Sequence, residues 1–372
     1  MFDVTTSLDD LLGSIAAALQ LTELQYREAQ EIYTEISRWI EQDPEIQRLA
    51  PQIYPQGSLV LGTTCKPKGR QEFDLDFVCE LRIDFRLVDN PVILLNLIEK
   101  RLRTHPRFGS QVSRENRCIR VRLANRFHLD VVPACPDTAM GNDCIFVPDR
   151  EAGGWKPSNP RGYRQWFEGR SELVIRAIEA RELLPSRESY LAKAPLKRGV
   201  QIVKRWRDTV FFDSAVREFA PASCILTTLA GESYRGEISL SGVVSSIIEG
   251  MLSAASHSSP PVIVNPANSK EIMNERWLED PRSYRIFSQK VQQFSEDWAR
   301  LQKERGLPRI AAVLRHLFGE ELTDTVLSEK VRHIGEARKS GALGIAAGSG
   351  FLTIGPGIGV TPVRANTFYG DR

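Results

Sequence analysis

Two acidic residues interrupt a stretch that otherwise has the composition of a buried strand. In "EFDLDFVCEL", Asp74 and Asp76 alternate with Phe73, Leu75 and Phe77. Because strand side chains alternate between faces, this spacing predicts two carboxylates about 7 Å apart on one face, with three apolar side chains on the other. The strand must therefore lie in a sheet with one apolar face covered. Its acidic face either borders a site that uses both carboxylates or protects a sheet edge.

A divalent cation between the two carboxylates would relieve their repulsion, and Mg²⁺ prefers such oxygen ligands. Asp130, in "HLDVVPA", is a single acid among apolar residues on another predicted strand. The predicted metal-binding and catalytic set is thus Asp74, Asp76 and Asp130. It would hold two Mg²⁺ ions about 4 Å apart, with Mn²⁺ as a substitute, to activate an attacking hydroxyl. A turn or capping role for Asp130 is the alternative.

The stretch "QGSLVLGTT" precedes this strand and supplies candidate phosphate-binding groups. Gly57 would let the backbone approach a triphosphate closely, and the Ser58 hydroxyl with nearby amides could bind phosphate oxygens. A Gly-Ser pair alone is typical of an ordinary turn. The ordered set of Gly-Ser, then Asp-x-Asp, then a later strand with Asp130 is more specific, because independent positions must agree.

The pattern of the chain changes near residue 160, and its 372 residues are enough for about two domains. Strand and hairpin patterns dominate before that point, and amphipathic helices follow. We therefore predict an α+β protein with a first domain over 1–160, a helical domain over 161–340 and a flexible Gly-rich tail over 341–372. Residues 341–363 carry no charge, which would also permit a membrane span, but seven glycines and two prolines oppose a continuous helix.

Composition narrows the expected cellular compartment and the expected kinds of partner. The net charge of +2 favours no polyanion partner, and six cysteines without a CxxC pair argue against a zinc module. The first twenty residues begin acidic, unlike a signal peptide, so we expect a cytoplasmic protein with free thiols. Eight arginines lie between Arg101 and Arg126 against one acid, Glu115. They indicate either a basic patch for a nucleotide, RNA or a partner protein, or a solvated face.

Together the motifs resemble those of the DNA polymerase β-like nucleotidyltransferases, and more narrowly the CD-NTases (cGAS/DncV-like nucleotidyltransferases) of CBASS anti-phage signalling in bacteria. The resemblance covers residues 50–335 and rests on these stretches: "PQGSLVLGT", "EFDLDFVCEL", "FHLDVVPA", "IFVPDREAGGWKPSNPRGYRQWF", "LKRGVQIVKRWRD", "ASCILTTL" and "VNPANSKEIMNERW". It implies a nucleotidyltransferase core and a C-terminal helical domain in a cage like that of cGAS and oligoadenylate synthase, with an N-terminal helix as a spine. It also implies an enzyme that joins NTPs, such as ATP and GTP, into a cyclic di- or trinucleotide, for example cyclic GMP-AMP.

The resemblance further implies that Lys204 and Ser223 contact the donor triphosphate. The alternatives are a solvated helix face for Lys204 and a helix N-cap after Pro221 for Ser223. An aromatic residue that stacks on a base follows this serine in the animal relative, whereas Cys224 follows here, so stacking must come from elsewhere. His128 shares the strand face of Asp130, but a packed or surface histidine is the simpler interpretation.

The family also suggests partners. No Cys/His cluster could build a zinc-bearing DNA insertion, so we expect no DNA requirement. We also expect no membrane association, because the glycines and prolines of residues 341–363 oppose a spanning helix. In many relatives a ubiquitin-transfer-like accessory protein conjugates the C-terminal tail, but here Asp371 and Arg372 follow Gly370. Two alternative functions are a template-independent nucleotidyltransferase that extends RNA ends and a catalytically dead scaffold. Near-neutral charge disfavours the first, and the complete acidic set disfavours the second.

Overall fold

The computed structural model describes residues 8–69, 72–123, 127–141, 143–171, 190, 193–346, 352–354 and 360–363. The strands are β1 (Gln52–Gln56), β2 (Phe73–Glu80), β3 (Val112–Arg114), β4 (Ile119–Leu123), β5 (Phe127–Pro136), β6 (Ile145–Asp149), β7 (Gly154–Ser158), β8 (Val264–Asn265), β9 (Asn268–Ile272), β10 (Leu343–Ala346), β11 (Leu352–Ile354) and β12 (Val360–Pro362).

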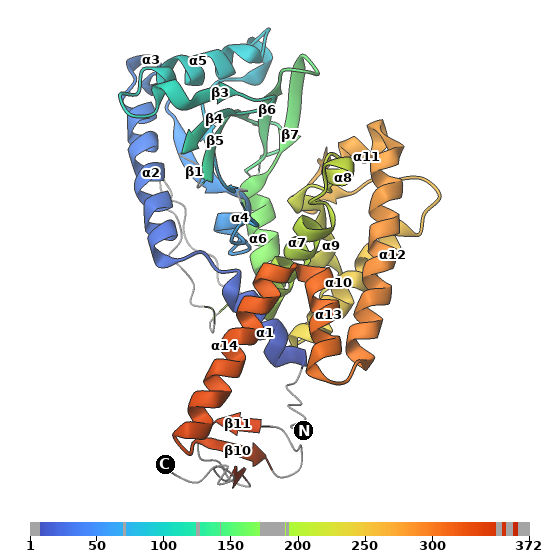
Figure 1. Cartoon of the computed structure of the whole chain (residues 1–372). Helices are drawn as coiled ribbons and strands as arrows, with labels where there is room; N and C mark the ends of the chain where they lie inside the picture. The colour runs from blue at the N-terminus through green and yellow to red at the C-terminus, as the bar shows by residue number, and fades with distance from the viewer. Residues whose placement is uncertain are drawn as a thin grey trace.

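The α-helices of the described residues divide between the two halves of the molecule, which lie side by side in Figure 1. The first half contains α2 (Glu23–Glu41), α3 (Pro44–Gln47), α4 (Gly57–Val60) and α5 (Val92–Arg103). The second contains α1 (Leu8–Ala18), α6 (Pro160–Arg170), α7 (Pro195–Val210), α8 (Ser214–Arg217), α9 (Ser223–Ser233), α10 (Leu240–Ala255), α11 (Glu275–Glu279), α12 (Pro281–Lys303), α13 (Leu307–Phe318) and α14 (Glu320–Lys339).

Seven of the described strands form one twisted sheet, in the order β1-β2-β5-β4-β3, with β6 and β7 continuing from β5. β2 and β5 are parallel, whereas β1 pairs with β2, and β4 with β5, in antiparallel fashion. The apolar residues Phe73, Leu75 and Phe77 of β2 are buried as predicted, and they pack with α2 and α5 in one hydrophobic core. One face of the sheet is therefore covered by helices, while the face that carries the acids is left for a site.

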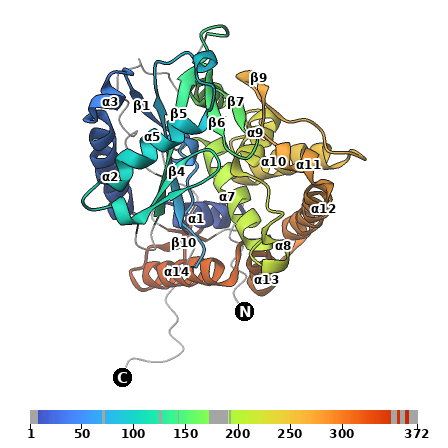
Figure 2. The ribbon, with the colours of Figure 1, turned by 90° about the horizontal axis from the view of Figure 1, so that it is seen from above.

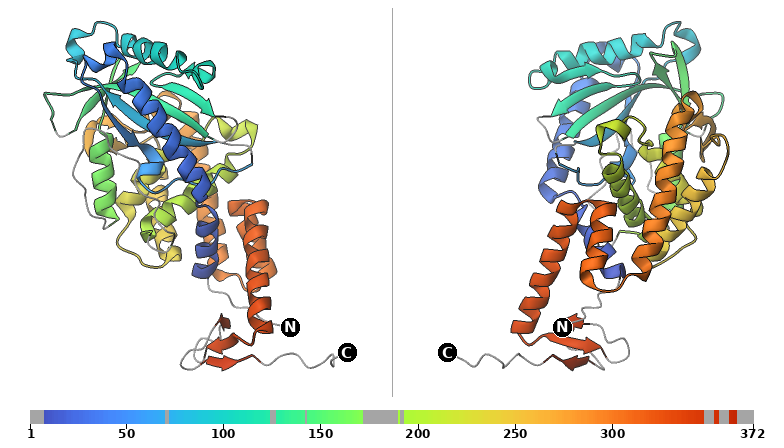
Figure 3. Two further views of the ribbon diagram at one scale, coloured as in Figure 1. Left: turned by 90° about the vertical axis from the view of Figure 1, so that its left-hand side faces the viewer. Right: turned by 45° about the vertical axis from the view of Figure 1, so that its right-hand side comes forward.

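The helices that follow residue 160 gather to one side of the sheet (Figure 2), and a second hydrophobic core lies among them. Trp206 of α7 stacks on Phe294 of α12 with ring centroids 4.4 Å apart, and both side chains are buried. The N-terminal segment joins the two cores, because α1 packs within the helical core and α2 within the sheet core. In Figure 3 these two helices run along the molecule as the spine that the family resemblance implies.

The α+β fold class is confirmed. The segment after residue 341, which was expected to be a flexible tail, contains regular structure. β10 pairs with both β11 and β12 in a small antiparallel sheet that projects from the end of α14 (Figures 1 and 3). Residues such as Ile345, Thr353 and Thr361 favour extended backbone, and the pairing satisfies hydrogen bonds that a loose tail would leave to water. Residues 364–372, including Gly370, lie outside the described residues, and the domain boundaries at 160 and 340 stay a prediction.

Two compositional expectations can be checked directly. All six cysteines are free thiols. No helix in the described part of the chain is long and apolar enough to cross a membrane.

The arginines of the 101–126 segment that the structure describes each lie near a carboxylate: Arg101 near Asp43, Arg103 and Arg114 near Glu99, Arg107 near Glu35, Arg117 near Asp149, Arg120 near Asp130, and Arg122 near Glu115. These contacts oppose a free basic patch.

Candidate active site

Strand register organises the acidic face of the sheet. β2 and β5 are parallel neighbours, and their register places Asp76 beside Asp130. It also places Asp74 beside His128. On its other edge β5 pairs with β4, which sets Arg120 opposite Asp130. The three carboxylates expected from the sequence thus occupy neighbouring positions on two adjacent strands.

Two of these carboxylates have basic partners. Arg120 donates from Nε and Nη2 to the two carboxylate oxygens of Asp130 at 2.7 and 2.6 Å, a bidentate pair that fixes the orientation of both side chains. His128 Nε2 lies 2.9 Å from Asp74 Oδ1, so this histidine is part of the acidic face rather than a separate packed residue. Asp76 forms no ion pair within the described part of the chain.

The different surroundings of the acids separate their pKa values. Burial, with the negative charges of Asp74 and Asp130, raises the pKa of Asp76 to about 8. Burial acts in the same direction on Asp74, but the hydrogen bond and charge of His128 outweigh it and hold the pKa of Asp74 below its ordinary value. Without a cation, Asp76 therefore holds its proton to a higher pH than Asp74 does.

Gly57 and Ser58 begin α4 directly beside these acids, because the last residue of β1, Gln56, pairs with Asp76. Gly57 has φ +73°, and a Cβ at this position would lie 2.5 Å from Asp76 Oδ2. Glycine is required here both by the backbone conformation and by the close approach of the carboxylate. The Ser58 hydroxyl shares a hydrogen bond of 3.0 Å with Thr64 Oγ1.

The predicted helical residues form the opposite side of the site. Lys204 of α7 is buried, with 5% of its surface exposed, and its Nζ donates to the carbonyl of Thr63 at 3.0 Å. A solvated helix face is therefore wrong for Lys204. Ser223 is the first residue of α9, whose N-cap is Ala222, so the N-cap alternative for Ser223 is also wrong.

These two sides line one cleft of about 800 Å³. We call them the sheet wall (the acids of β2 and β5 with Arg120 and Arg122 of β4) and the helix wall (Lys204, Arg207 and Ser223 of α7 and α9). The predicted site residues among its lining side chains are Gly57, Ser58, Asp74, Asp76, Lys204 and Ser223. Asp130 is not among the lining residues, but it is hydrogen-bonded to Arg120, which is.

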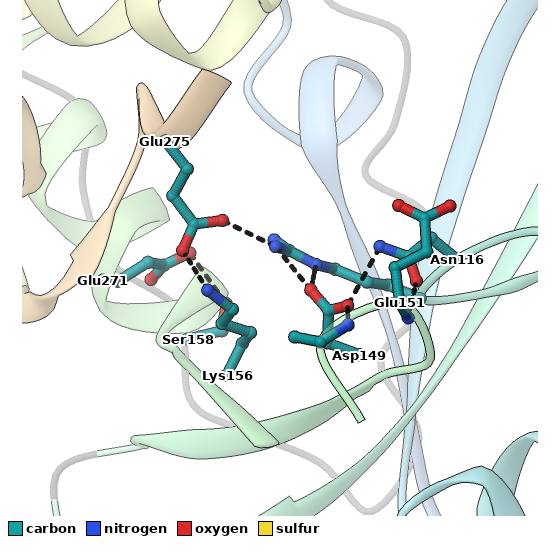
Figure 4. A network of polar contacts seen from close by, with 9 residues as sticks. Asn116, Asp149, Glu151, Lys156, Ser158, Glu271 and Glu275 are labelled. Carbon is teal, nitrogen blue, oxygen red and sulfur yellow. Dashed lines mark hydrogen bonds and ion pairs between the residues drawn. The ribbon is translucent and has the colours of Figure 1, made fainter. Parts of the chain in front are cut away.

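A polar network near Ser158 and Glu271, two residues that line the cleft, links the two halves of the molecule (Figure 4). Arg117 donates to Asp149 from Nε at 2.8 Å and to Glu275 from Nη2 at 2.6 Å. Lys156 of β7 donates to the same Glu275 at 2.6 Å. The sheet half is thereby tied to α11 of the helical half by charge-assisted hydrogen bonds.

Glu271 of β9 makes a second set of hydrogen bonds beside this network, and it also lines the cleft. It accepts from Ser158 Oγ at 2.9 Å, from the amide of Asn159 at 2.8 Å and from Asn265 Nδ2 at 2.6 Å. The "SNPRGY" and "NPAN" stretches, quoted above for the narrower resemblance, therefore meet here. Glu271 thus joins the two stretches by hydrogen bonds at the wall of the cleft.

Comparison with known proteins decides the family. The family model described as Second Messenger Oligonucleotide or Dinucleotide Synthetase domain matches residues 7–170. The structure of the Bradyrhizobium diazoefficiens CD-NTase CdnG in complex with GTP superposes with a TM-score of 0.72 at 22% identity, covering 87% of this chain and 98% of that one. A c-di-GMP synthase of Roseivirga ehrenbergii is 32% identical over 373 residues, 98% of each chain. The chain belongs to the CD-NTase family.

The protein is therefore a nucleotidyltransferase, as the acidic strand pair indicated. A further relative, the cyclic dinucleotide synthase CdnG of Bradyrhizobium diazoefficiens, is 25% identical over 98% of this chain and 95% of its own. Identity extends over nearly the full length of both relatives. The resemblance read from the motifs is confirmed at the level of family and fold.

Two observations bear on the predicted metal site. Among the described residues, no three His, Cys, Asp or Glu side chains converge as a ready cation site. Arg120 engages both oxygens of Asp130, and His128 engages Asp74. The residues are nevertheless suited to a divalent cation, since Asp76 has two acidic neighbours and no basic partner in the described chain.

Sequence reasoning missed several residues that line the cleft. Arg207 contacts Ser223, and Arg120 holds Asp130, but neither arginine belongs to a recognised spacing. Tyr163 is an aromatic side chain at the cleft, where its hydroxyl shares a hydrogen bond of 3.0 Å with Thr228. The sequence carried one signal for it, because Tyr163 ends the "SNPRGY" stretch.

Proposed function

We propose that this nucleotidyltransferase condenses two NTPs into a cyclic dinucleotide and releases two pyrophosphates. The observation that carries the proposal is the acidic row of the sheet wall facing the basic helix wall across one cleft. Such opposed charges suit a triphosphate whose α-phosphorus must meet a hydroxyl beside the acids while its outer phosphates are held away from them. The c-di-GMP synthase and CdnG relatives support a dinucleotide product, and the GTP complex of CdnG supports GTP as substrate.

Mg²⁺ is the proposed cofactor, with Asp74, Asp76 and Asp130 as its protein ligands. Bound there, divalent cations would lower the pKa of the attacking hydroxyl and neutralise charge on the leaving pyrophosphate. Asp76 would lose the proton that it holds without a cation, and Asp130 would free an oxygen from Arg120. Gly57 leaves room for Asp76 to turn, because it has no side chain at the point of closest approach.

The helix wall would bind the donor. In this proposal Lys204 and the Ser223 hydroxyl contact the triphosphate, and Ser58 contributes from the sheet side. Each of the two transfers forms one phosphodiester bond at the α-phosphorus and breaks the bond to pyrophosphate. The intermediate then returns its own triphosphate to the helix wall and its free hydroxyl to the acids, so that a single cleft serves both transfers.

The cellular role that we propose is the one that the family resemblance implies: the enzyme makes a second messenger for anti-phage defence in the cytoplasm. Conjugation of the tail by a ubiquitin-transfer-like accessory protein also stays a prediction. ATP with GTP, which would give cyclic GMP-AMP, is the second substrate choice that the first experiment should separate from GTP alone.

The test is product analysis. The purified chain is incubated with Mg²⁺ and GTP alone, ATP alone, both, or all four NTPs, then treated with phosphatase and analysed by mass spectrometry. We expect a phosphatase-resistant cyclic dinucleotide containing guanine, because a ring has no terminal phosphate to remove. Linear extended products would favour an RNA-end transferase, and NTP binding without pyrophosphate release would favour an inactive scaffold. Either result would overturn the proposal.

A further inference from the structure

Arg207 lies at the centre of the helix wall, although no motif singles it out. It follows Lys204 by three residues on α7, so the two side chains share one face of the helix. Both line the cleft, together with Ser223. The question is what a second basic residue does beside the lysine that is proposed to hold the triphosphate.

Its contacts are specific. Arg207 donates from Nη1 to Ser223 Oγ at 2.6 Å and from Nε to Asp208 Oδ1 at 2.8 Å. A weaker bond of 3.5 Å runs from Nη1 to the carbonyl of Pro221. The side chains of Arg207 and Asp208 are only 17% and 19% exposed. Asp208 therefore fixes the guanidinium from one side while the guanidinium holds the serine on the other.

The chemistry of this contact determines the direction of the Ser223 hydroxyl. A guanidinium has donors and no acceptor, so Ser223 Oγ must accept from Arg207. The proton of the hydroxyl must then point elsewhere, and the described residues include none that accepts a hydrogen bond from Ser223 Oγ. A donor that is left open at the wall of a cleft suits an anionic ligand such as a phosphate oxygen.

We propose that Arg207, held by Asp208, is a positioning residue that turns the Ser223 hydroxyl proton toward the triphosphate of the donor nucleotide. Four of the five N–H groups of a guanidinium are committed to Asp208, Ser223 and Pro221. Arg207 therefore acts on the triphosphate through Ser223 and does not bind the phosphates directly. The inference rests on the proposed function, since it requires Ser223 to contact a triphosphate.

The experiment is a double-mutant cycle on nucleotide affinity, measured by calorimetry with a non-hydrolysable GTP analogue, GDP and GMP. The variants are Ser223→Ala, Arg207→Met and both together, with Arg207→Lys as a conservative replacement. Arg198→Met is the matched control, because its guanidinium lies on the same helix but over the Tyr190 ring, 5.3 Å from the centroid. Melting curves report whether each variant folds.

We expect each single change to weaken binding of the GTP analogue about 10-fold, as for hydrogen bonds with a charged partner. The double variant should be no weaker than Ser223→Ala, GMP affinity should not change, and Arg207→Lys should recover part of the loss. Independent losses that multiply in the double variant would show direct phosphate contact by Arg207 and overturn the inference. Loss in Ser223→Ala with none in Arg207→Met would also overturn it. No loss in Ser223→Ala would instead remove the proposed role of Ser223.

Discussion

The two walls of the cleft are built by different means. On the sheet wall, backbone pairing places Asp76 beside Asp130 and Arg120 opposite Asp130, so the acids are held by strand register. On the helix wall, Lys204 and Arg207 reach loop and helix-end groups through side-chain hydrogen bonds. The sheet wall gathers three carboxylates and leaves Asp76 without a basic partner in the described chain, whereas the helix wall pairs each charge with a fixed acceptor.

This difference indicates which part of the proposed reaction each wall serves. Register tolerates no gradual adjustment, because a slip of one residue moves every side chain to the other face. The sheet wall therefore suits groups that must meet reacting atoms in one geometry. The helix wall depends on contacts that a substitution can weaken one at a time, which suits graded binding of phosphates. The predictions below test this contrast, starting with the sheet wall.

Asp130→Asn should have the largest effect. It keeps the size of the side chain but removes a proposed metal ligand and leaves Arg120 without its bidentate partner. We expect product formation to fall by more than about 100-fold, measured as pyrophosphate release. Asp84→Asn is the control, since Asp84 also pairs with an arginine, the exposed Arg86, but does not line the cleft. An Asp130→Asn enzyme within about tenfold of wild type would remove the sheet wall from the mechanism.

Gly57→Ala tests the close approach of backbone and acid. The added methyl would lie 2.5 Å from Asp76 Oδ2, so the carboxylate must move, and we expect turnover to fall by about 10- to 100-fold. Gly69→Ala is a matched control, because Gly69 also has positive φ (+61°) but nothing lies within 4 Å of its added methyl. Equal losses in the two variants would assign the effect to backbone strain and not to Asp76.

Lys204→Gln tests the helix wall. Glutamine can still donate to the Thr63 carbonyl, so the loop should stay in place while the positive charge is lost. We predict about 10-fold weaker binding of the non-hydrolysable GTP analogue and a smaller change for GMP, measured by calorimetry. Lys270→Gln, at an exposed position outside the cleft, should change neither. A loss of equal size for GMP and the triphosphate would contradict a phosphate-binding role.

Asp76→Asn should stabilise the metal-free protein while it abolishes turnover. The folded-state pKa of Asp76 is raised to about 8 from an ordinary value of 3.8, so the wild type loses stability as pH rises between these values. Asparagine has no such loss, and the stability difference should grow from pH 4 toward pH 8 and reach about 1–3 kcal/mol. Denaturant unfolding in EDTA measures it; a difference independent of pH would contradict the electrostatic account.

The acids of the sheet wall could be predicted from the residues themselves, whereas the helix wall could not: Lys204 and Ser223 came only from the family resemblance, and Arg207 was missed. Alternation in β2 put Asp74 and Asp76 on one face without any knowledge of their partners. That Arg120 would lie opposite Asp130 depends on the register of a separate hairpin strand. Arg207 meets Ser223 only because α7 and α9 pack together, and no local pattern specifies that contact. The small sheet after residue 341 was also missed, since its strands are short and separated by glycines.

The most direct test of the account is the product assay on the Asp74→Asn, Asp76→Asn double variant beside wild type, with Mg²⁺, GTP and ATP. The account predicts a phosphatase-resistant cyclic dinucleotide from wild type. From the variant it predicts no cyclic product, with an unchanged circular dichroism spectrum. Cyclic product from the double variant at the wild-type rate would contradict the central claim that these carboxylates carry the chemistry.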